Sequence, residues 1–223
     1  MPPFPPMESG SLFSPPPQPT QMAIPDGELS LYAPCLTPAE ADRAFNSLLT
    51  ETPWRQESIT LFGKRYPQPR LIAWYGDPGK TYRYSGLLLH PLPWTETLIS
   101  LKTQVEALAA APFNSVLLNY YRHGQDSMGW HSDDEPELGV NPVIASLSLG
   151  ASRRFCLRHR FASKNPTRSR PDRAKVELWL SHGSLLVMAG TTQHYWQHAI
   201  PKTAKAIGPR LNLTFRWVQT TTA

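Results

Sequence analysis

The segment from Arg210 to Trp217 alternates strictly between polar and apolar side chains. A period of two is typical of a β-strand whose two faces meet different surroundings. One interpretation is a strand with a solvated polar face. The other is a strand packed on both sides, with two arginines that face the inside of a barrel and need carboxylate partners. The apolar face would hold Leu211, Leu213, Phe215 and Trp217, and the polar face Arg210, Asn212, Thr214 and Arg216.

Short alternating or apolar runs, separated by turn residues, recur through the rest of the chain. They predict strands at residues 58–64, 69–77, 81–86, 143–150, 155–157, 176–180 and 183–188. Many short strands divided by turns indicate a sandwich or a barrel. Two helices accompany them, one after the capping sequence Thr37-Pro38-Ala39-Glu40 and one from Pro93 to about Ala110. The expected fold is therefore mainly β with flanking helices (α+β).

Composition limits what else the chain can be. Residues 1–27 contain nine of the 24 prolines, so we expect a disordered tail followed by one domain over residues 28–220. No run approaches the roughly 18 apolar residues of a membrane span, which predicts no membrane partner. Cys35 and Cys156 form neither a disulfide framework nor a zinc motif, which favours a reducing compartment. We expect a monomer, cytoplasmic in a bacterium or nuclear in a eukaryote.

Positive charge is concentrated in one segment of the chain. Residues 153–175 hold nine Lys and Arg against a single acid, Asp172, in a chain of net charge +5. A solvated loop is one explanation; clustering favours the other, a surface that faces nucleic-acid phosphates. Residues 58–86 combine aromatic side chains with Lys64, Arg70, Lys80 and Arg83. Such a mixture suits base stacking, although aromatics in strands more often belong to a core.

A candidate metal group begins with His131 and Asp133. They stand two residues apart, so their side chains leave the same face of an extended backbone. With a second histidine they would complete the two-histidine, one-carboxylate set of non-haem Fe(II) oxygenases. We take His198 as that ligand, because it enters an apolar strand after a turn. A rival interpretation has His194 and His198 hold zinc on one helix, but Tyr195 stands where a zinc protease motif has Glu.

The candidate metal ligands and the arginine side of the last strand together suggest a single binding site. A metal with open positions can bind one end of a dicarboxylate, while a guanidinium pairs with its other end. The sequence therefore predicts an oxygenase site in which a dicarboxylate cosubstrate lies between iron and arginine.

These stretches resemble the AlkB family. The resemblance rests on Asn119-Tyr120-Tyr121 with Trp130-His131-Ser132-Asp133-Asp134-Glu135, on residues 144–150, on residues 183–186, and on Arg210 to Arg216. Members of that family are dioxygenases that use Fe(II), 2-oxoglutarate and O₂ to repair alkylated nucleic acid. The resemblance implies a double-stranded β-helix (jelly roll) at about residues 113–218, with N-terminal nucleotide-recognition lid hairpins at about residues 55–88.

The same resemblance implies roles for individual residues. The catalytic iron would be bound by His131, Asp133 and His198. The cosubstrate 2-oxoglutarate would be contacted by Asn119, Tyr121, Arg210, Asn212, Thr214 and Arg216. The substrate would be contacted by a hairpin finger of Phe62, Gly63 and Lys64, by the lid residues Tyr82, Arg83 and Tyr84, and by Asp134.

The implied reaction removes an N-methyl group from 1-methyladenine or 3-methylcytosine in alkylated DNA. 2-Oxoglutarate is decarboxylated to succinate, the methyl group is hydroxylated, and the product collapses to formaldehyde and the repaired base. Two alternatives stay open: the same chemistry on RNA or a protein side chain, and a nucleic-acid-binding module without catalysis. Strand preference is also open, because Trp130 resembles single-strand-preferring relatives and Phe62 duplex-preferring ones.

Overall fold

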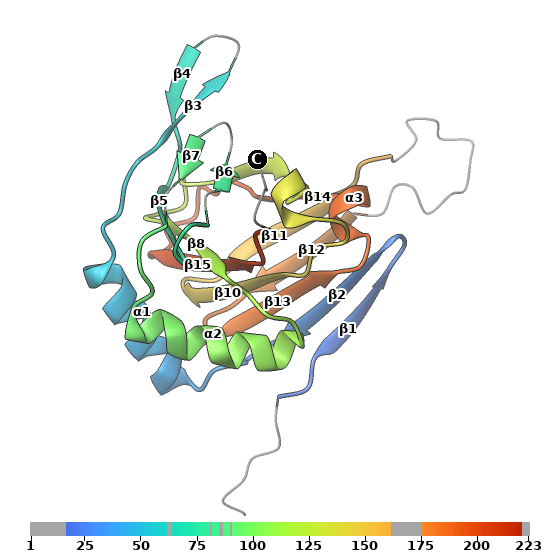
Figure 1. Ribbon diagram of the computed structural model, residues 1–223, viewed down its shortest axis with the longest axis horizontal. Coiled ribbons are helices and arrows are strands. Elements are labelled where there is room, and N and C mark those ends of the chain that lie inside the picture. The colour runs from blue at the N-terminus through green and yellow to red at the C-terminus, as the bar shows by residue number, and fades with distance from the viewer. Residues whose placement is uncertain are drawn as a thin grey trace, which may run out of the picture.

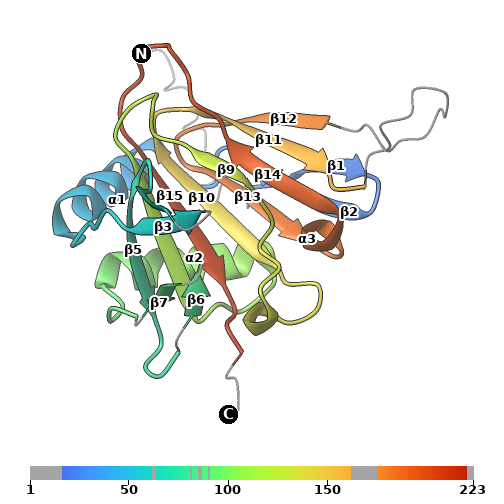
Figure 2. The ribbon, with the colours of Figure 1, turned by 90° about the horizontal axis from the view of Figure 1, so that it is seen from above.

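Two antiparallel β-sheets lie face to face in the computed structural model, which describes residues 17–61, 64–80, 82–84, 87–89, 91–161 and 175–219 (Figures 1 and 2). The larger sheet has seven strands, in the order β1 (Thr20–Ile24), β2 (Gly27–Tyr32), β13 (Ser184–Ala189), β10 (Ile144–Gly150), β15 (Arg210–Arg216), β8 (Ser115–Tyr121) and β5 (Leu71–Gly76). The smaller sheet has four, in the order β12 (Lys175–Leu180), β11 (Arg153–His159), β14 (Trp196–Ile200) and β9 (Met128–His131). The predicted jelly roll is confirmed.

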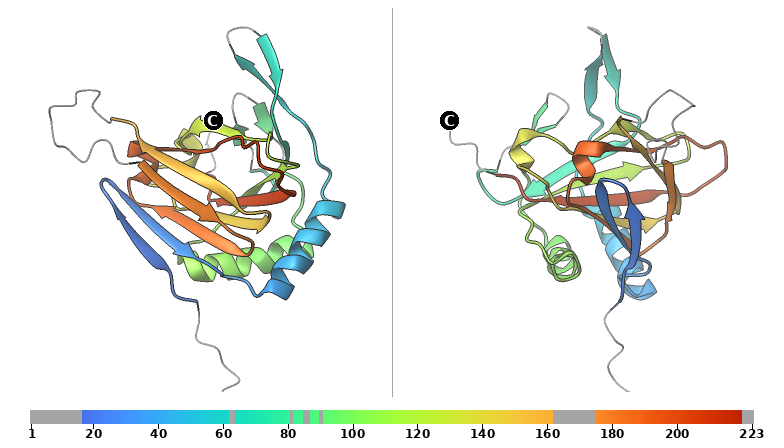
Figure 3. Two further views of the ribbon diagram at one scale, coloured as in Figure 1. Left: turned by 180° about the vertical axis from the view of Figure 1, so that it is seen from behind. Right: turned by 90° about the vertical axis from the view of Figure 1, so that its right-hand side faces the viewer.

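Two helices cover the outer face of the seven-stranded sheet (Figures 1 and 3). Helix α1 (Pro38–Glu51) begins at the predicted capping box, in which the Thr37 hydroxyl accepts from the Glu40 N–H and the Glu40 carboxylate accepts from the Thr37 N–H. Helix α2 (Glu96–Ala109) begins about a turn later than predicted, because the Thr95 hydroxyl caps it. The apolar side of β15 joins the core on this face, which includes Leu48, Leu98, Leu101, Leu211, Leu213 and Phe215.

The two sheets enclose a second core. Its apolar part is built from both sheets and includes Leu29, Leu117, Ile144, Leu186, Phe155, Leu157, Leu180 and Trp196. The polar side of β15 is buried too, with Arg210, Asn212, Thr214 and Arg216 all inside. The interpretation of this strand as solvated on its polar side is therefore wrong. Trp217 departs from the predicted alternation: the strand ends at Arg216, and the Trp217 side chain is 48% exposed.

A β-hairpin stands where the sequence predicts the end of a disordered tail. Strands β1 and β2 pair with each other, and β2 adds to the large sheet by pairing with β13. The prediction of a tail is wrong for residues 20–27, and residues 1–16 lie outside the described part of the chain. Composition could not show that β13, far along the chain, supplies hydrogen-bond partners, or that Leu29 fills the second core.

Two hairpins project from one end of the sandwich (Figure 1). Strand β3 (Ser58–Leu61) pairs with β4 (Lys64–Pro67), and β6 (Tyr82–Tyr84) pairs with β7 (Leu87–Leu89). Both fall within the predicted lid. Strand β5, between them, does not belong to a lid: it pairs with β8 and is buried along most of its length. Its apolar side chains feed both cores, so the jelly roll extends beyond residues 113–218.

Two short helical turns complete the described elements, η1 (Pro136–Leu138) and α3 (Thr192–Tyr195). Within the described residues, no helix has both the length and the apolar character needed to cross a membrane.

Candidate metal centre and carboxylate pocket

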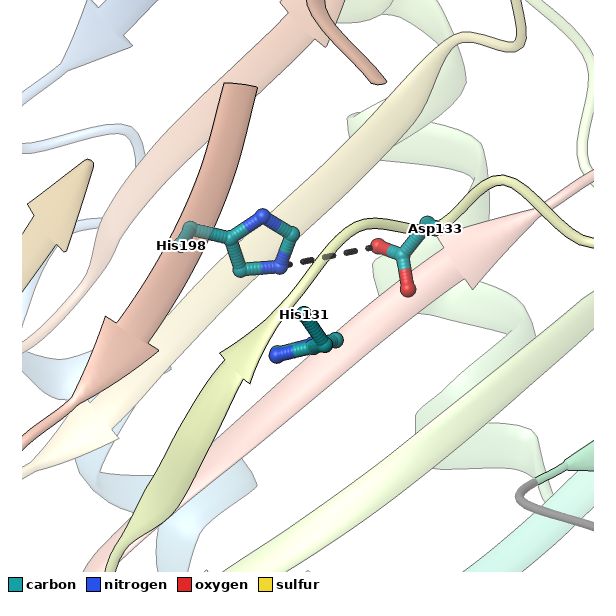
Figure 4. A group of neighbouring side chains, drawn as sticks. All are labelled: His131, Asp133 and His198. Carbon is teal, nitrogen blue, oxygen red and sulfur yellow. Dashed lines mark ion pairs between the residues drawn. The ribbon is translucent and has the colours of Figure 1, made fainter. Parts of the chain in front are cut away.

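Three potential metal ligands converge between the two sheets (Figure 4). One ligand atom from each of His131, Asp133 and His198 lies within 4.8 Å of the other two. Strand pairing explains the convergence: His198 on β14 stands opposite His131 on β9, and their ring centroids are 4.2 Å apart. Asp133 follows the end of β9, and its Oδ2 lies 3.9 Å from Nε2 of His198. The predicted trio is therefore one spatial group.

The two imidazoles are held by different neighbours. Nδ1 of His131 lies 2.9 Å from the Gly129 carbonyl oxygen, so a proton on Nδ1 leaves Nε2 available as a ligand. His198 is buried and stacks on the Phe155 ring at a centroid distance of 5.3 Å. Burial lowers the pKa of both histidines, to about 3 for His198, whose pKa His131 lowers further. Both rings are neutral at pH 7, which is the form that binds a metal.

Asp133 is the carboxylate of the group and is almost fully buried. Its Oδ1 accepts a hydrogen bond from Nη2 of Arg216 at 2.8 Å, and its backbone N–H donates to Oε1 of Gln193 at 2.9 Å. Burial raises the pKa of Asp133, but Arg216, His198 and His131 together lower it to about 2. The other oxygen, Oδ2, is buried without a hydrogen-bond partner among the described residues. Such an oxygen is costly unless a cation meets it, so the group fits a divalent metal.

Arg210 lies at the other end of the polar side of β15. It stands six positions before Arg216, which is roughly 20 Å of strand. Its guanidinium carbon is 5.2 Å from the centre of the Tyr121 ring, and its Nη2 donates to Oγ of Ser148 at 2.9 Å. Burial lowers the pKa of Arg210 to about 10, so it stays a cation at pH 7. Its Nε and Nη1 are buried and find no acceptor within the described residues, so this arginine fits an anion such as a carboxylate.

Amide and hydroxyl groups lie between these two ends. The Asn212 side chain donates to Oγ of Ser146 at 2.8 Å and accepts from the Thr214 hydroxyl at 3.1 Å. Asn119 stands opposite Asn212 in the β8–β15 register, and its Oδ1 accepts from Nε of Arg70 at 2.7 Å. Because Arg70 uses the amide oxygen of Asn119, the amide nitrogen is the group that can donate to an anion.

One cavity joins most of the predicted metal and cosubstrate residues. It is lined by Asn119, Tyr121, His131, Asp133, His198, Asn212, Thr214 and Arg216, and Arg210 lies against the Tyr121 ring. Two of the predicted substrate residues, Asp134 and Lys64, do not line this cavity. Asp134 is exposed and pairs with Arg160 at 2.6 Å, and Lys64 is exposed at the start of β4. Tyr82, Arg83 and Tyr84 form β6, of which only the backbone is described, and Phe62 and Gly63 lie outside the described residues.

The zinc alternative is wrong. Helix α3 ends at Tyr195, so His194 and His198 do not share a helix. His194 is exposed, whereas His198 is buried on β14.

Three residues reach the site without having been assigned to it from the sequence: Gln193, Arg70 and Arg153. The predicted role of Arg70 and Arg153 as surface cations is wrong, since each is only 3% exposed. Arg153 donates to the carbonyl oxygens of Asp126 and Pro201 at 2.9 and 2.8 Å and lies 5.6 Å from the Tyr121 ring. No local sequence signal marks these three, because the partners of each come from distant segments.

A jelly roll that holds two histidines and a carboxylate between its sheets, beside a buried arginine, defines the class of non-haem Fe(II) oxygenases. Comparison with known proteins agrees with this class. The model of the 2OG-Fe(II) oxygenase superfamily matches residues 28–216. The chain therefore belongs to the 2OG-Fe(II) oxygenase superfamily and, as its relatives indicate, to the AlkB family within it. Members of the superfamily use Fe(II) and 2-oxoglutarate with O₂, and the donor set described above fits both.

Two relatives and one solved structure are representative. The alpha-ketoglutarate-dependent dioxygenase alkB homolog 3 of Bos taurus is 45% identical over 193 residues, which cover 82% of this chain and 65% of that protein. The DNA oxidative demethylase ALKBH2 of Homo sapiens is 43% identical over 182 residues, 80% of this chain and 69% of that protein. The structure of OsALKBH1 has a TM-score of 0.58 at 17% identity, over 89% of this chain and 100% of that one, which supports the fold. The chain thus spans about two thirds of the length of its curated relatives, 65% for the bovine protein.

Proposed function

We propose that this protein is an oxidative demethylase that removes N-methyl groups from alkylated DNA bases, with 1-methyladenine and 3-methylcytosine as substrates. The names of its relatives support this substrate class, since the human relative is a DNA oxidative demethylase. The observation that carries the proposal is Oδ2 of Asp133, a buried carboxylate oxygen without a hydrogen-bond partner among the described residues, 3.9 Å from an imidazole nitrogen. A module that only binds nucleic acid has no use for such an uncompensated oxygen.

In this proposal His131, Asp133 and His198 hold Fe(II). Bound there with 2-oxoglutarate, the metal supplies the oxidation of a methyl C–H bond by O₂. The chain supplies the positioning. Arg216 fixes Oδ1 of Asp133 and so leaves Oδ2 for the metal, and the Gly129 carbonyl fixes the ring of His131.

The cosubstrate is held from the other end of the cavity. Arg210 pairs with the carboxylate of 2-oxoglutarate that is remote from the metal, because its Nε and Nη1 are buried donors that no described residue meets. The remaining contacts come from Asn119, Tyr121, Asn212, Thr214 and Arg216. One O₂ then gives a hydroxymethyl group on the base nitrogen, together with succinate and CO₂. Cleavage of the C–N bond releases formaldehyde and restores the base.

The substrate enters at the end from which the two hairpins project. We propose that Phe62, Gly63 and Lys64 act as a finger between bases, that Tyr82, Arg83 and Tyr84 hold the flipped base, and that Asp134 contacts its exocyclic amine. We also propose a monomer in a reducing compartment, nuclear in a eukaryote or cytoplasmic in a bacterium. Two free thiols, Cys35 and Cys156, are compatible with that compartment.

The test is formaldehyde release from methylated single-stranded DNA, duplex DNA, RNA and peptide, each with and without 2-oxoglutarate. We expect release from DNA that requires 2-oxoglutarate. His131→Ala should abolish release while DNA affinity is kept, and His194→Ala, a matched exposed histidine, should leave release unchanged. Full turnover by His131→Ala would refute the iron assignment. Release from RNA or peptide alone would refute the DNA substrate.

A further inference from the structure

The outer face of the four-stranded sheet carries an aromatic side chain next to the metal group. Helices α1 and α2 both lie against the other sheet, and no helix of the described residues covers this face (Figures 2 and 3). Strands β9 and β14 pair at His131 with His198 and at Met128 with Ile200. Between these pairs β9 has two residues, Gly129 and Trp130, and β14 has only Ala199, so β9 contains a β-bulge. Bulges re-aim side chains beside active sites. Trp130 precedes His131 in sequence and is 40% exposed.

A guanidinium is stacked on this tryptophan. The central carbon of Arg158 lies 4.4 Å from the centre of the Trp130 ring, which is close enough for a cation–π contact. Gln197 fixes the plane of the guanidinium, because its Oε1 accepts from both Nε and Nη2 of Arg158, at 3.0 and 2.8 Å. Gln197 and Arg158 are themselves paired across β14 and β11, so the stack is held by the sheet.

The surroundings of this stack favour a polyanion. The pairing of β11 with β12 places Arg154, Arg158 and Lys175 on this face, and all three are exposed. Lys202 and Lys205 are also exposed and line one cavity with Arg154. The acid Glu177, on the same face, is already paired with Arg154 at 3.4 Å. A planar aromatic and guanidinium surface within an excess of positive charge is the combination that binds a nucleobase together with its phosphates.

We propose that the Trp130–Arg158 stack, defined by these two side chains, is a platform for an unpaired base that flanks the methylated nucleotide. The inference rests on the proposed function and names its substrate class: single-stranded nucleic acid. In a duplex, the faces of a flanking base are already covered by its neighbours, so a stacking platform gains nothing from it. In a single strand the base is free to turn, and stacking on a fixed surface stabilises the complex.

The experiment measures binding of a labelled oligonucleotide with one 3-methylcytosine, at one stated salt concentration, with Mn(II) and 2-oxoglutarate present so that no turnover occurs. Trp130→Ala should weaken binding to the single strand roughly 5- to 100-fold, the loss of one stacked base. Binding to the duplex should change less than 2-fold. Trp130→Phe should keep most of the affinity. Trp179→Ala removes another exposed tryptophan of the same sheet and should have no strand-selective effect.

A second variant and a modified oligonucleotide identify stacking as the cause. Replacing the flanking base by an abasic residue should weaken binding by the wild-type protein as much as Trp130→Ala does. The same replacement should not weaken binding by the Trp130→Ala variant any further. Arg158→Lys keeps the positive charge but lacks the planar guanidinium. The variant should therefore lose the part of the affinity that depends on the flanking base, while its affinity should depend on salt concentration as in wild type. The Mn(II) affinity and the melting temperature of Trp130→Ala report whether that variant folds. If it does not fold, Arg158→Lys tests the platform in its place.

Three results would overturn the inference: equal losses on single strand and duplex, a loss in Trp130→Ala that adds fully to that of the abasic residue, or no loss at all. These differ from failure of the proposed function. If the wild-type protein neither binds nor demethylates any of the oligonucleotides, the proposed function itself is refuted. If the wild-type protein is active and Trp130→Ala binds as tightly as wild type, only the platform is refuted.

Discussion

Buried polar atoms that find no hydrogen-bond partner in the described part of the chain are the most informative features at the residue scale. Oδ2 of Asp133 is an acceptor that needs a cation, and Nε and Nη1 of Arg210 are donors that need an anion. Each such group, left unmet, costs about 1–3 kcal/mol. A bound metal ion would supply the cation, and a dicarboxylate that chelates this metal would supply the anion. The residues are thus complementary to a bound pair of cofactors rather than to each other.

The first prediction concerns the support of the metal carboxylate. Gln193 is buried and accepts the Asp133 N–H at 2.9 Å, so Gln193→Met removes that acceptor without much change in volume. Loss of a residue that orients a ligand typically weakens metal binding about 10- to 100-fold. Titration of Mn(II) by calorimetry measures it. Gln125→Met, at an exposed glutamine, is the control and should bind Mn(II) like wild type. Equal affinities in all three proteins would show that Gln193 does not support the site.

At the scale of elements, local signals predicted some segments and missed others for identifiable reasons. The capping box before α1 and the alternation in β15 are encoded within a few residues, so both were predicted correctly. Strand β2 was missed because its partner, β13, lies far along the chain. The metal trio could be predicted from His131 and Asp133, which are neighbours. Gln193 could not, because its contact with Asp133 exists only in the folded chain.

The second prediction concerns the start of α1. Thr37→Ala removes the hydroxyl that accepts the Glu40 N–H, and such a loss destabilises a protein by about 1 kcal/mol. For a domain of this size the melting temperature should fall by about 2–4 °C. Thr50→Ala is the matched control: its hydroxyl bonds carbonyl oxygens within the helix and caps nothing, so the melting temperature should hold or rise slightly. A larger fall in Thr50→Ala would contradict the role of the cap.

The third prediction concerns the turn between β8 and β9, which connects the cosubstrate and metal residues. Burial raises the pKa of Asp126, but the hydrogen bonds from the Arg122 side chain and backbone lower it more. A lowered folded-state pKa stabilises the protein above the unfolded value of about 3.9, and this stabilisation disappears as pH falls through the folded pKa. Asp126→Asn should therefore lower the free energy of unfolding at pH 7. The expected loss is only about 1 kcal/mol, because Arg122 is partly exposed and solvent screens the ion pair.

Urea unfolding at pH 7, 5, 4 and 3 tests this prediction. The difference between wild type and Asp126→Asn should be constant from pH 7 to pH 5 and should shrink toward pH 3. A difference that persists unchanged at pH 3 would mean that the charge of Asp126 is not what stabilises the turn.

At the scale of the whole molecule, the seven-stranded sheet separates two different interiors. The core beneath the helices is apolar and holds the sheet, while the space between the sheets combines apolar side chains with buried arginines and a carboxylate. Because the polar part of the second interior is complementary to ligands, ligand binding should raise the stability of the entire fold.

The fourth prediction gives this coupling a size. A ligand that binds only the folded state at 100 times its dissociation constant adds about 2.7 kcal/mol to the free energy of unfolding. For a domain of about 200 residues that is a rise of roughly 5–11 °C in melting temperature. Mn(II) should give one such rise, and 2-oxoglutarate should add a second only when Mn(II) is present, because its keto acid end needs the metal.

Variants at the two ends of the cavity separate these contributions. Arg210→Met should keep the rise caused by Mn(II) and lose most of the rise caused by 2-oxoglutarate, since Arg210 meets only the remote carboxylate. Asp133→Asn should lose both, because without the metal carboxylate there is no chelate for the cosubstrate. Glutarate, which has both carboxylates but no keto group, should add little to wild type. If 2-oxoglutarate stabilised Arg210→Met as much as wild type, the remote carboxylate would have another partner, and the direction assigned to the cosubstrate in the cavity would be wrong.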